Sequence, residues 1–170
     1  MNNPLKIYVD FDGVILDTWD IIYPEYCRVC QQTEIDDRLI DVMLSIGWKK
    51  ILEESKVIKN NIQKVKDLAK DYDVCVLSKI NSSEEEQEKE KFLKKNGIQK
   101  MCFVPYAHSK ANYVDPTHAI LIDDTIENLD EWDGKGGISI YFQQKSKDSD
   151  NFDIKNSKYL TINDLLEIYD

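Results

Sequence analysis

Two pairs of aspartates each follow a short apolar run. Asp10 and Asp12 come after LKIYV, with Gly13 behind them, and Asp123 and Asp124 follow AILI. Carboxylates one residue apart at the end of a strand project toward the same side of the chain, and glycine lets the backbone turn sharply. If the two strands are neighbours, these carboxylates converge and repel one another unless a cation lies between them. Oxygen ligands of this kind suit magnesium.

The Asp10–Gly13 segment has two alternative interpretations. A simple turn is one, because Asp and Gly are common turn formers. A calcium loop of the EF-hand kind is the other, and it fails because the later ligands and the closing glutamate are absent at the required spacing. Asp-x-Asp-Gly alone is a weak signal, but its pairing with a second acidic strand end makes it a strong one.

Two further residues could handle a phosphate group. Ser78 follows the run VCVL, where its hydroxyl and the succeeding backbone amides could hold a phosphate oxygen. Lys110 lies in the loop after MCFVPYAHS, where an ammonium could offset the charge of a nucleophile and a phosphate. Each residue alone says little, but all of these groups follow successive strand-like runs.

The elements that position these groups predict an α/β fold. Five apolar runs bounded by polar turns predict buried strands at Leu5–Val9, Val74–Leu77, Met101–Val104, Ala119–Ile122 and Ile138–Phe142. Helical spacing predicts helices at Ile58–Tyr72, Ser83–Lys95, Ile126–Trp132 and, closing the chain, Thr161–Tyr169. Strands that alternate with helices predict a Rossmann-like parallel sheet of about five strands flanked by helices. Ligands bind such sheets at the carboxyl ends of the strands.

Residues 18–57 differ from the rest of the chain. They carry several aromatic residues, no convincing strand and plausible short helices. They interrupt the crossover from the first strand to the second, so we expect a small helical cap inserted after the first strand. Residues 1–17 and 58–170 would then form the catalytic core.

The charged run Glu84–Lys95 predicts a solvated helix face. Ser83 and Glu86 have the spacing of a capping box, and acidic residues precede lysines. Pairs such as Glu85 with Lys89 add support between residues four apart.

The cysteines carry a weaker signal. Cys27 and Cys30 form a Cys-x-x-Cys, which could bind zinc or act as a redox pair. Cys75 and Cys102 stand singly in strand-like runs, and the two histidines are scattered. We therefore interpret the pair as two thiols one turn apart on a helix in a reducing compartment.

Composition limits the partners. The net charge is −10, from 22 Lys and Arg against 32 Asp and Glu, and such a surface repels polymeric nucleic acid and anionic membranes. A small phosphorylated metabolite remains compatible, because a bound cation and local lysines can reverse the sign. No apolar run approaches the roughly 20 residues that span a bilayer. The first residues have no signal-peptide pattern, so a cytoplasmic location is expected.

The acidic pairs, the serine and the lysine together resemble the haloacid dehalogenase (HAD) superfamily. That family has Asp-x-Asp, then Ser or Thr, then Lys, then an acidic pair. In this chain these are Asp10 and Asp12, Ser78, Lys110, and Asp123 with Asp124. The resemblance covers nearly the whole chain, and residues 18–57 stand where the family carries its first-type cap.

The resemblance implies a magnesium-dependent phosphohydrolase with two steps. Asp10 would attack phosphorus to give an aspartyl-phosphate, and Asp12 would protonate the leaving oxygen and then activate water. Ser78 and Lys110 would position the phosphoryl group. An Asp at position 12 favours a phosphatase over a dehalogenase, because dehalogenation needs no acid for a leaving alcohol.

The resemblance implies a Mg²⁺ site that involves four aspartates. Asp10, the main-chain carbonyl of Asp12, and Asp124 would be ligands. Asp123 would be a direct ligand or would support one, and the sequence leaves open which of the last two binds the cation.

A finer resemblance concerns the substrate. The segment LIDDTIENLDEWDGKGGISIYF resembles the cytosolic 5'(3')-deoxyribonucleotidase group, in which an acidic pair precedes an Asn and a later Gly-Gly strand. It implies a 5'-nucleotidase that acts on small (deoxy)nucleoside monophosphates. The aromatic residues of 18–57 could stack a base, although at helical spacing they more often pack a cap on a core. The candidate substrate-binding residues are Phe11, Gly13, Lys79, Trp19 and Tyr23.

Other functions stay open at this point. A sugar-phosphate or phosphoglycolate-type phosphatase would use the same core with a different cap. A catalytically silent HAD-fold binding domain is an alternative of another class, although such a domain would not need Asp12. A mutase or phosphotransferase would pass the phosphoryl group to an acceptor other than water.

Overall fold

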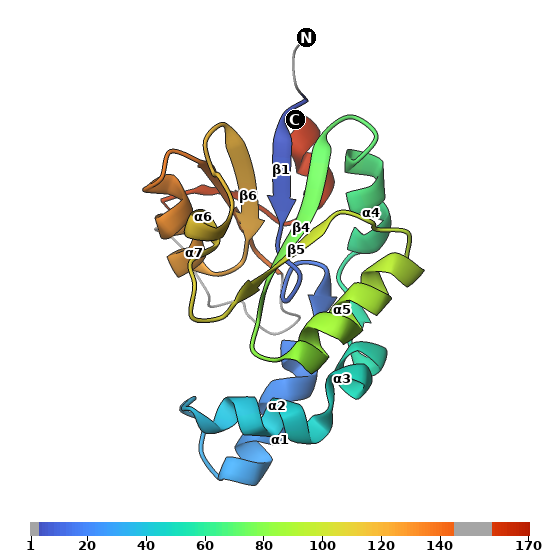
Figure 1. Ribbon diagram of the computed structural model, residues 1–170, viewed down its shortest axis with the longest axis vertical. Coiled ribbons are helices and arrows are strands. Elements are labelled where there is room, and N and C mark those ends of the chain that lie inside the picture. Colours follow the sequence, from blue (N-terminus) through green and yellow to red (C-terminus); the bar gives the residue numbers. More distant parts are fainter. Residues whose placement is uncertain (1–3, 145–157) are drawn as a thin grey trace.

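The computed structural model describes residues 4–144 and 158–170 and places six strands in one parallel sheet. The strands are β1 (Lys6–Val9), β4 (Asp73–Ile80), β5 (Met101–Pro105), β6 (Ala119–Asp123), β7 (Ile138–Phe142) and β8 (Leu160–Ile162). Their order across the sheet is β5-β4-β1-β6-β7-β8. All five predicted strands are present, and with the flanking helices they confirm the predicted α/β fold (Figure 1).

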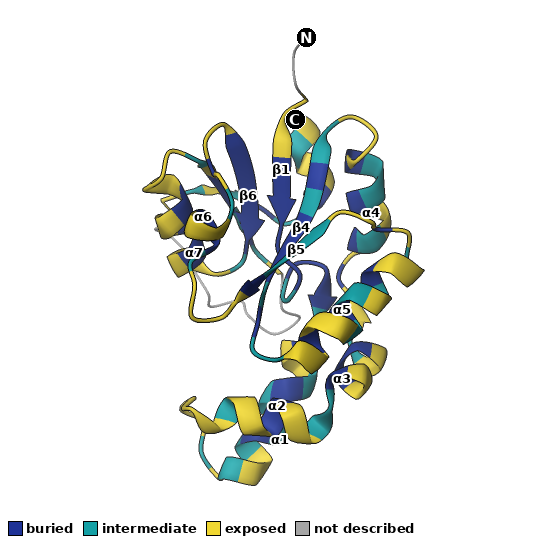
Figure 2. Ribbon diagram, viewed as in Figure 1, coloured by how far each residue is buried: buried dark blue, intermediate teal, exposed yellow. Residues whose placement is uncertain are grey.

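Helices cover both faces of the sheet. Side chains of a strand alternate between its faces, so Ile7 and Val9 pack in one buried cluster and Tyr8 packs in another. The first cluster includes residues of α4 (Asn61–Leu68) and α5 (Ser83–Lys95), and the second includes residues of α7 (Ile126–Asp133). The central strands are therefore buried on both sides (Figure 2).

The closing helix predicted over Thr161–Tyr169 is wrong in its first half. Leu160–Ile162 form β8, which pairs with β7, and the Gln143 amide donates to the Ile162 carbonyl at 2.9 Å. The open edge of β7 satisfies these backbone groups, and β-branched residues suit a strand. Only Leu165–Tyr169 are helical, as a short 3-10 helix.

Other boundaries differ less. The predicted helix Ile58–Tyr72 is shortened to α4, because Asn60 adopts a left-handed conformation before it and turns follow Leu68. The predicted helix Ser83–Lys95 coincides with α5. No helix in the described residues is long and apolar enough to cross a bilayer. The predicted core range 58–170 includes residues 145–157, which lie outside the described part.

Three helices occupy the insertion after the first strand. They are α1 (Trp19–Cys30), α2 (Arg38–Ile46) and α3 (Trp48–Glu54), and Figure 1 shows them beyond the carboxyl ends of the central strands. The expectation of no strand here needs correction. Lys56–Val57 (β3) pairs antiparallel with Leu16–Asp17 (β2), which brings the two ends of the insertion together. The insertion thus stands over the sheet edge where a ligand would bind.

Candidate active site

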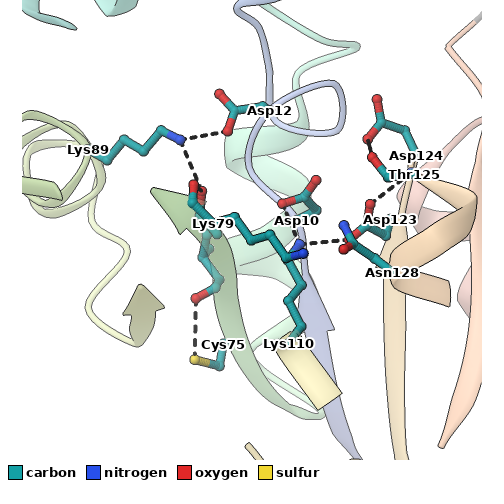
Figure 3. Close-up of polar contacts among 12 residues, drawn as sticks. Asp10, Asp12, Cys75, Lys79, Lys89, Lys110, Asp123, Asp124, Thr125 and Asn128 are labelled. Atoms are coloured by element: carbon teal, nitrogen blue, oxygen red, sulfur yellow. Dashed lines mark hydrogen bonds and ion pairs between the residues drawn. The ribbon is translucent and has the colours of Figure 1, made fainter. Parts of the chain in front are cut away.

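Asp10 lies directly after β1, at the centre of the sheet. β1 pairs with β6, as the convergence of the two acidic segments requires, and the Asp10 amide donates to the Ile122 carbonyl at 2.9 Å. The Lys110 ammonium joins the two segments. Its Nζ lies 2.7 Å from Asp10 Oδ1 and 2.7 Å from Asp123 Oδ2 (Figure 3). The structure therefore brings together one group from each of three of the four sequence motifs.

Lys110 is not in a loop, as the sequence suggested, but is the first residue of the short helix α6 (Lys110–Tyr113). Ser109 begins this helix, because its Oγ accepts a hydrogen bond from the Ala111 amide at 3.2 Å. Burial alone would lower the pKa of Lys110, but the charges of Asp10 and Asp123 outweigh burial and raise it. The buried side chain is therefore a fixed positive charge.

Three carboxylates form a cluster that could hold a metal ion. Oxygen atoms of Asp10, Asp123 and Asp124 all lie within 4.8 Å of one another. Burial and the neighbouring carboxylates raise the pKa of Asp10 to about 7, although Lys110 opposes this shift. Burial, together with Asp10 and Asp123, raises the pKa of Asp124 to about 8. A divalent cation would relieve this repulsion, so the donor set fits magnesium.

Gly13 makes room for one of these carboxylates. Its φ angle is +77°, and a Cβ at this position would lie 1.9 Å from Asp124 Oδ2. Any side chain here would displace the Asp124 carboxylate from the cluster. The absence of a Cβ at Gly13 therefore leaves space for Asp124 in the candidate metal site. The substrate-binding role expected of Gly13 stays a prediction.

Asp123 and Asp124 differ in how many hydrogen bonds they accept. Asp123 accepts from the Lys110 ammonium, from the Thr125 amide at 2.9 Å and from Asn128 Nδ2 at 3.0 Å. Asp124 accepts a longer bond, at 3.4 Å, from Thr125 Oγ1. The Asp124 carboxylate therefore has more capacity left for a cation. Asn128 was noted in the sequence only as part of a resemblance.

Asp12 lies two residues beyond Asp10 and is held on both oxygens. Thr18 Oγ1 donates to Asp12 Oδ1 at 2.8 Å, and Lys89 Nζ donates to Asp12 Oδ2 at 2.6 Å (Figure 3). The Asp12 side chain is still 36% exposed. It can therefore meet a substrate while its orientation is fixed.

The prediction of a fully solvated face for α5 is wrong at Glu85 and Lys89. Both side chains are buried, and they form an ion pair at 2.7 Å. With Leu93 they recur every four residues, so they continue the buried stripe of the helix toward its start. This four-residue spacing could have predicted that Glu85 and Lys89 are buried, but the many charged residues of the run favoured an exposed face.

Ser78 lies within β4 rather than after it, and it is fully buried. Its Oγ accepts a hydrogen bond from Lys89 at 3.1 Å and lies 3.2 Å from the Lys79 carbonyl, to which it donates. The next side chain points elsewhere, since the Lys79 ammonium lies 5.7 Å from the centre of the Tyr106 ring. Of the two, Ser78 belongs to the Asp12 network.

The aromatic candidates occupy different environments. Phe11 is fully buried against Phe92, so its side chain belongs to the core and only its main chain could meet a substrate. Trp48 is buried as well. Trp19 is 44% exposed and stacks on Tyr23, with ring centres 5.4 Å apart. This stacked pair is the part of the insertion with an aromatic surface to offer.

The cysteine pair is not part of the cluster. The four cysteines are free thiols. Among residues 4–144 and 158–170, the one group of three or more potential metal ligands is the aspartate cluster.

Comparisons with solved structures find the same fold in HAD hydrolases. The HAD-like hydrolase SP0104 from Streptococcus pneumoniae is 14% identical with a TM-score of 0.69, over 99% of this chain and 98% of that chain. Bacillus subtilis YfnB, described as a HAD hydrolase and bound to magnesium, is 13% identical with a TM-score of 0.63, over 99% and 98%. A dehalogenase with an intermediate complex is 14% identical with a TM-score of 0.58, over 99% and 97%.

At these identities the likeness establishes the fold. No family model matches the chain, and no curated protein matches it.

Proposed function

We propose that this protein is a magnesium-dependent phosphomonoester hydrolase that works through an aspartyl-phosphate on Asp10. One observation carries the proposal. The Asp10 carboxylate lies 2.7 Å from the buried Lys110 ammonium and belongs to a cluster of three carboxylates. The carboxyl of Asp12, two residues further along the chain, is partly exposed. This arrangement supplies a nucleophile, a cation site and an acid.

The first step forms a bond between an Asp10 oxygen and phosphorus and breaks the bond to the leaving oxygen. Asp12, in its protonated form, gives its proton to that oxygen, so the alcohol leaves neutral. Lys110 and the Ser78 hydroxyl counter the charge on the phosphoryl group. In the second step Asp12 takes a proton from water, which attacks phosphorus, releases phosphate and regenerates Asp10.

The proposed metal ligands are Asp10, the Asp12 main-chain carbonyl and Asp124. When bound, the cation would neutralise charge on the phosphoryl oxygens. Asp123 accepts three hydrogen bonds from the protein, so we assign it to holding Lys110 and Asn128 rather than to binding the cation directly. The magnesium bound to YfnB, which has the same fold, supports magnesium as the cation.

The preferred substrate class is a small phosphorylated metabolite, with (deoxy)nucleoside 5'-monophosphates first. Two features support this choice, namely the resemblance of the segment Leu121–Phe142 to the 5'(3')-deoxyribonucleotidase group and the stack of Trp19 on Tyr23. Aromatic faces of this kind can stack a base.

The decisive experiment is phosphate release from nucleoside monophosphates, sugar phosphates and phosphoglycolate, with magnesium and then with EDTA. We expect magnesium-dependent release that is largest for deoxynucleotides. Asp10→Asn should lower turnover by at least about 1,000-fold, because the amide is no nucleophile, and should leave the far-UV circular dichroism spectrum unchanged. Release that persists in EDTA or in Asp10→Asn would refute the mechanism. Phosphate release from sugar phosphates alone would reject nucleotides as the substrate and would leave the proposed mechanism in place.

A further inference from the structure

Lys89 occupies an unusual place for a helix lysine. Its side chain is fully buried in the middle of α5, and its ammonium lies between two aromatic rings. Nζ is 5.0 Å from the centre of the Phe11 ring and 4.8 Å from the centre of the Trp48 ring. Phe11 precedes Asp12 in the sequence, and Trp48 belongs to α3 of the insertion. The charge is thus enclosed where the insertion meets the sheet.

The ammonium has no donor left for a substrate. A lysine has three N–H donors, and here Asp12, Glu85 and Ser78 accept them at 2.6, 2.7 and 3.1 Å. Glu85 is fixed in turn, because its second oxygen accepts from the Asn81 amide at 2.8 Å. The three acceptors therefore hold the ammonium in one position.

Two of these acceptors have roles in the proposed reaction. Asp12 is the proposed acid, and Ser78 is the proposed contact to a phosphoryl oxygen. Since Ser78 Oγ accepts from Lys89, its own hydrogen points away from Lys89 and is donated to the Lys79 carbonyl, which fixes the direction of the hydroxyl. Since Asp12 is held by Lys89 on one oxygen and by Thr18 on the other, its carboxyl cannot rotate away.

We propose that Lys89 is a positioning residue that fixes the Asp12 carboxyl and the Ser78 hydroxyl for transfer of the phosphoryl group. This inference rests on the proposed function, and it adds a residue outside the four motifs of the resemblance. Glu85 orients Lys89, and Trp48 and Phe11 exclude water from it. A buried ammonium is unfavourable unless it is paired, so the network stays together as a unit.

Two matched substrates separate positioning from a general structural effect. Phenyl phosphate and p-nitrophenyl phosphate have almost the same shape, but phenol is the weaker acid, so its release depends more on a proton from Asp12. The ratio kcat/KM covers the steps up to the first phosphoryl transfer. Lys89→Met should lower kcat/KM by about 100-fold for phenyl phosphate and by less than about 10-fold for p-nitrophenyl phosphate, since a general acid contributes most to a poor leaving group.

Lys94→Met is the control, because it removes the exposed pair of Lys94 with Glu90, at 2.5 Å, from the same helix. Lys94→Met should leave kcat/KM unchanged for both substrates. Lys89→Met leaves the buried Glu85 and the partly exposed Asp12 without their cation, so its fold is checked by circular dichroism. If it does not fold, Lys89→Met with Glu85→Gln removes both charges of the buried pair and should show the same selective loss.

A second comparison tests the route through Asp12. In an Asp12→Ala background, Lys89→Met should bring no further selective loss for phenyl phosphate, because residues that act as a unit are not additive. Equal losses on both substrates, or an unchanged kcat/KM for phenyl phosphate in a folded variant, would overturn the positioning role. If the wild-type protein releases phosphate neither from these two substrates nor from the metabolites named above, the proposed function itself fails, and the inference falls with it.

Discussion

At the scale of single residues, Gly13 tests how tightly the acidic cluster is packed. Gly13→Ala would place a Cβ 1.9 Å from Asp124 Oδ2, at a φ of +77°. We expect the variant to lose about 1–3 kcal/mol of stability from backbone strain. We also expect it to bind magnesium at least about 10-fold more weakly, because a ligand displaced from its geometry loses on the order of 1.4 kcal/mol or more. Isothermal titration calorimetry measures the second effect.

Gly136→Ala is the matched control for Gly13→Ala. Gly136 has a φ of +84°, but a Cβ there would meet no atom of the described residues within 4 Å. It should therefore show backbone strain and normal magnesium affinity. Equal magnesium affinity in both variants would mean that Gly13 does not shape the metal site.

The carboxylates also determine how the metal-free protein responds to pH. The pKa values of Asp10 and Asp124 are raised to about 7 and about 8 in the folded chain, against about 3.9 in an unfolded one. A raised carboxyl pKa means that the folded state binds protons more tightly, so its stabilising contribution is present at low pH and is lost as pH rises through these values. In EDTA, we expect the free energy of unfolding to fall by several kcal/mol between pH 5 and pH 8.5.

Urea denaturation at several pH values measures this loss. Asp124→Asn should flatten the profile and make the metal-free protein more stable than wild type at pH 8.5, because it removes one of the repelling charges. Adding magnesium should restore the free energy of unfolding of the wild-type protein at the same pH. If the free energy of unfolding depends on pH in the same way for the wild-type protein and for Asp124→Asn, repulsion between these carboxylates does not destabilise the folded state.

At the scale of elements, α5 depends on a cap that the sequence misplaced by one residue. The predicted cap was Ser83 with Glu86, but Ser82 Oγ accepts the Glu85 amide at 3.1 Å, and Ser83 is exposed. Ser82→Ala should lower the free energy of unfolding by about 1 kcal/mol. Ser83→Ala should change it by less than about 0.5 kcal/mol. Urea denaturation of both variants checks the order, and the reverse order would restore the first assignment.

Local patterns predicted some elements and missed others for a physical reason. The strands that lead to Asp10 and Asp123 are short apolar runs, so their own residues are enough to predict them. β8 is different, because it forms only against the edge of β7, and nothing within Leu160–Ile162 requires it. Lys89 was missed in the same way, since its partner Asp12 lies 77 residues away. A charge inside a charged run shows no sign of such a partner.

At the scale of the whole molecule, the insertion and the sheet share one apolar core. Buried residues of the insertion, among them Ile22, Trp48 and Ile51, belong to the same cluster as Ile7 and Val9 of β1. A segment of roughly 40 residues has too little interior to be stable without disulfides, metals or a partner surface. We therefore expect residues 18–57, predicted as a helical cap insertion, to depend on the sheet for their stability.

This dependence predicts a single unfolding transition. Trp48 reports on the insertion and Trp132 on the α7 face of the sheet, and both are buried. Two double variants isolate them, Trp19→Phe with Trp132→Phe, and Trp19→Phe with Trp48→Phe. Within each variant, tryptophan fluorescence and far-UV circular dichroism should give the same urea midpoint and slope, as a two-state protein requires.

A fluorescence change of Trp48 at lower urea than the loss of circular dichroism would mean that the insertion unfolds first. In that case the shared core would be weaker than its continuity suggests. The position of Lys89 makes this comparison informative for the site as well, because its ammonium lies 4.8 Å from the centre of the Trp48 ring. If the insertion separates from the sheet, Lys89 becomes exposed to water, and its hold on Asp12 weakens as screening increases. A single transition therefore implies that the acid of the proposed reaction keeps its orientation for as long as the protein is folded.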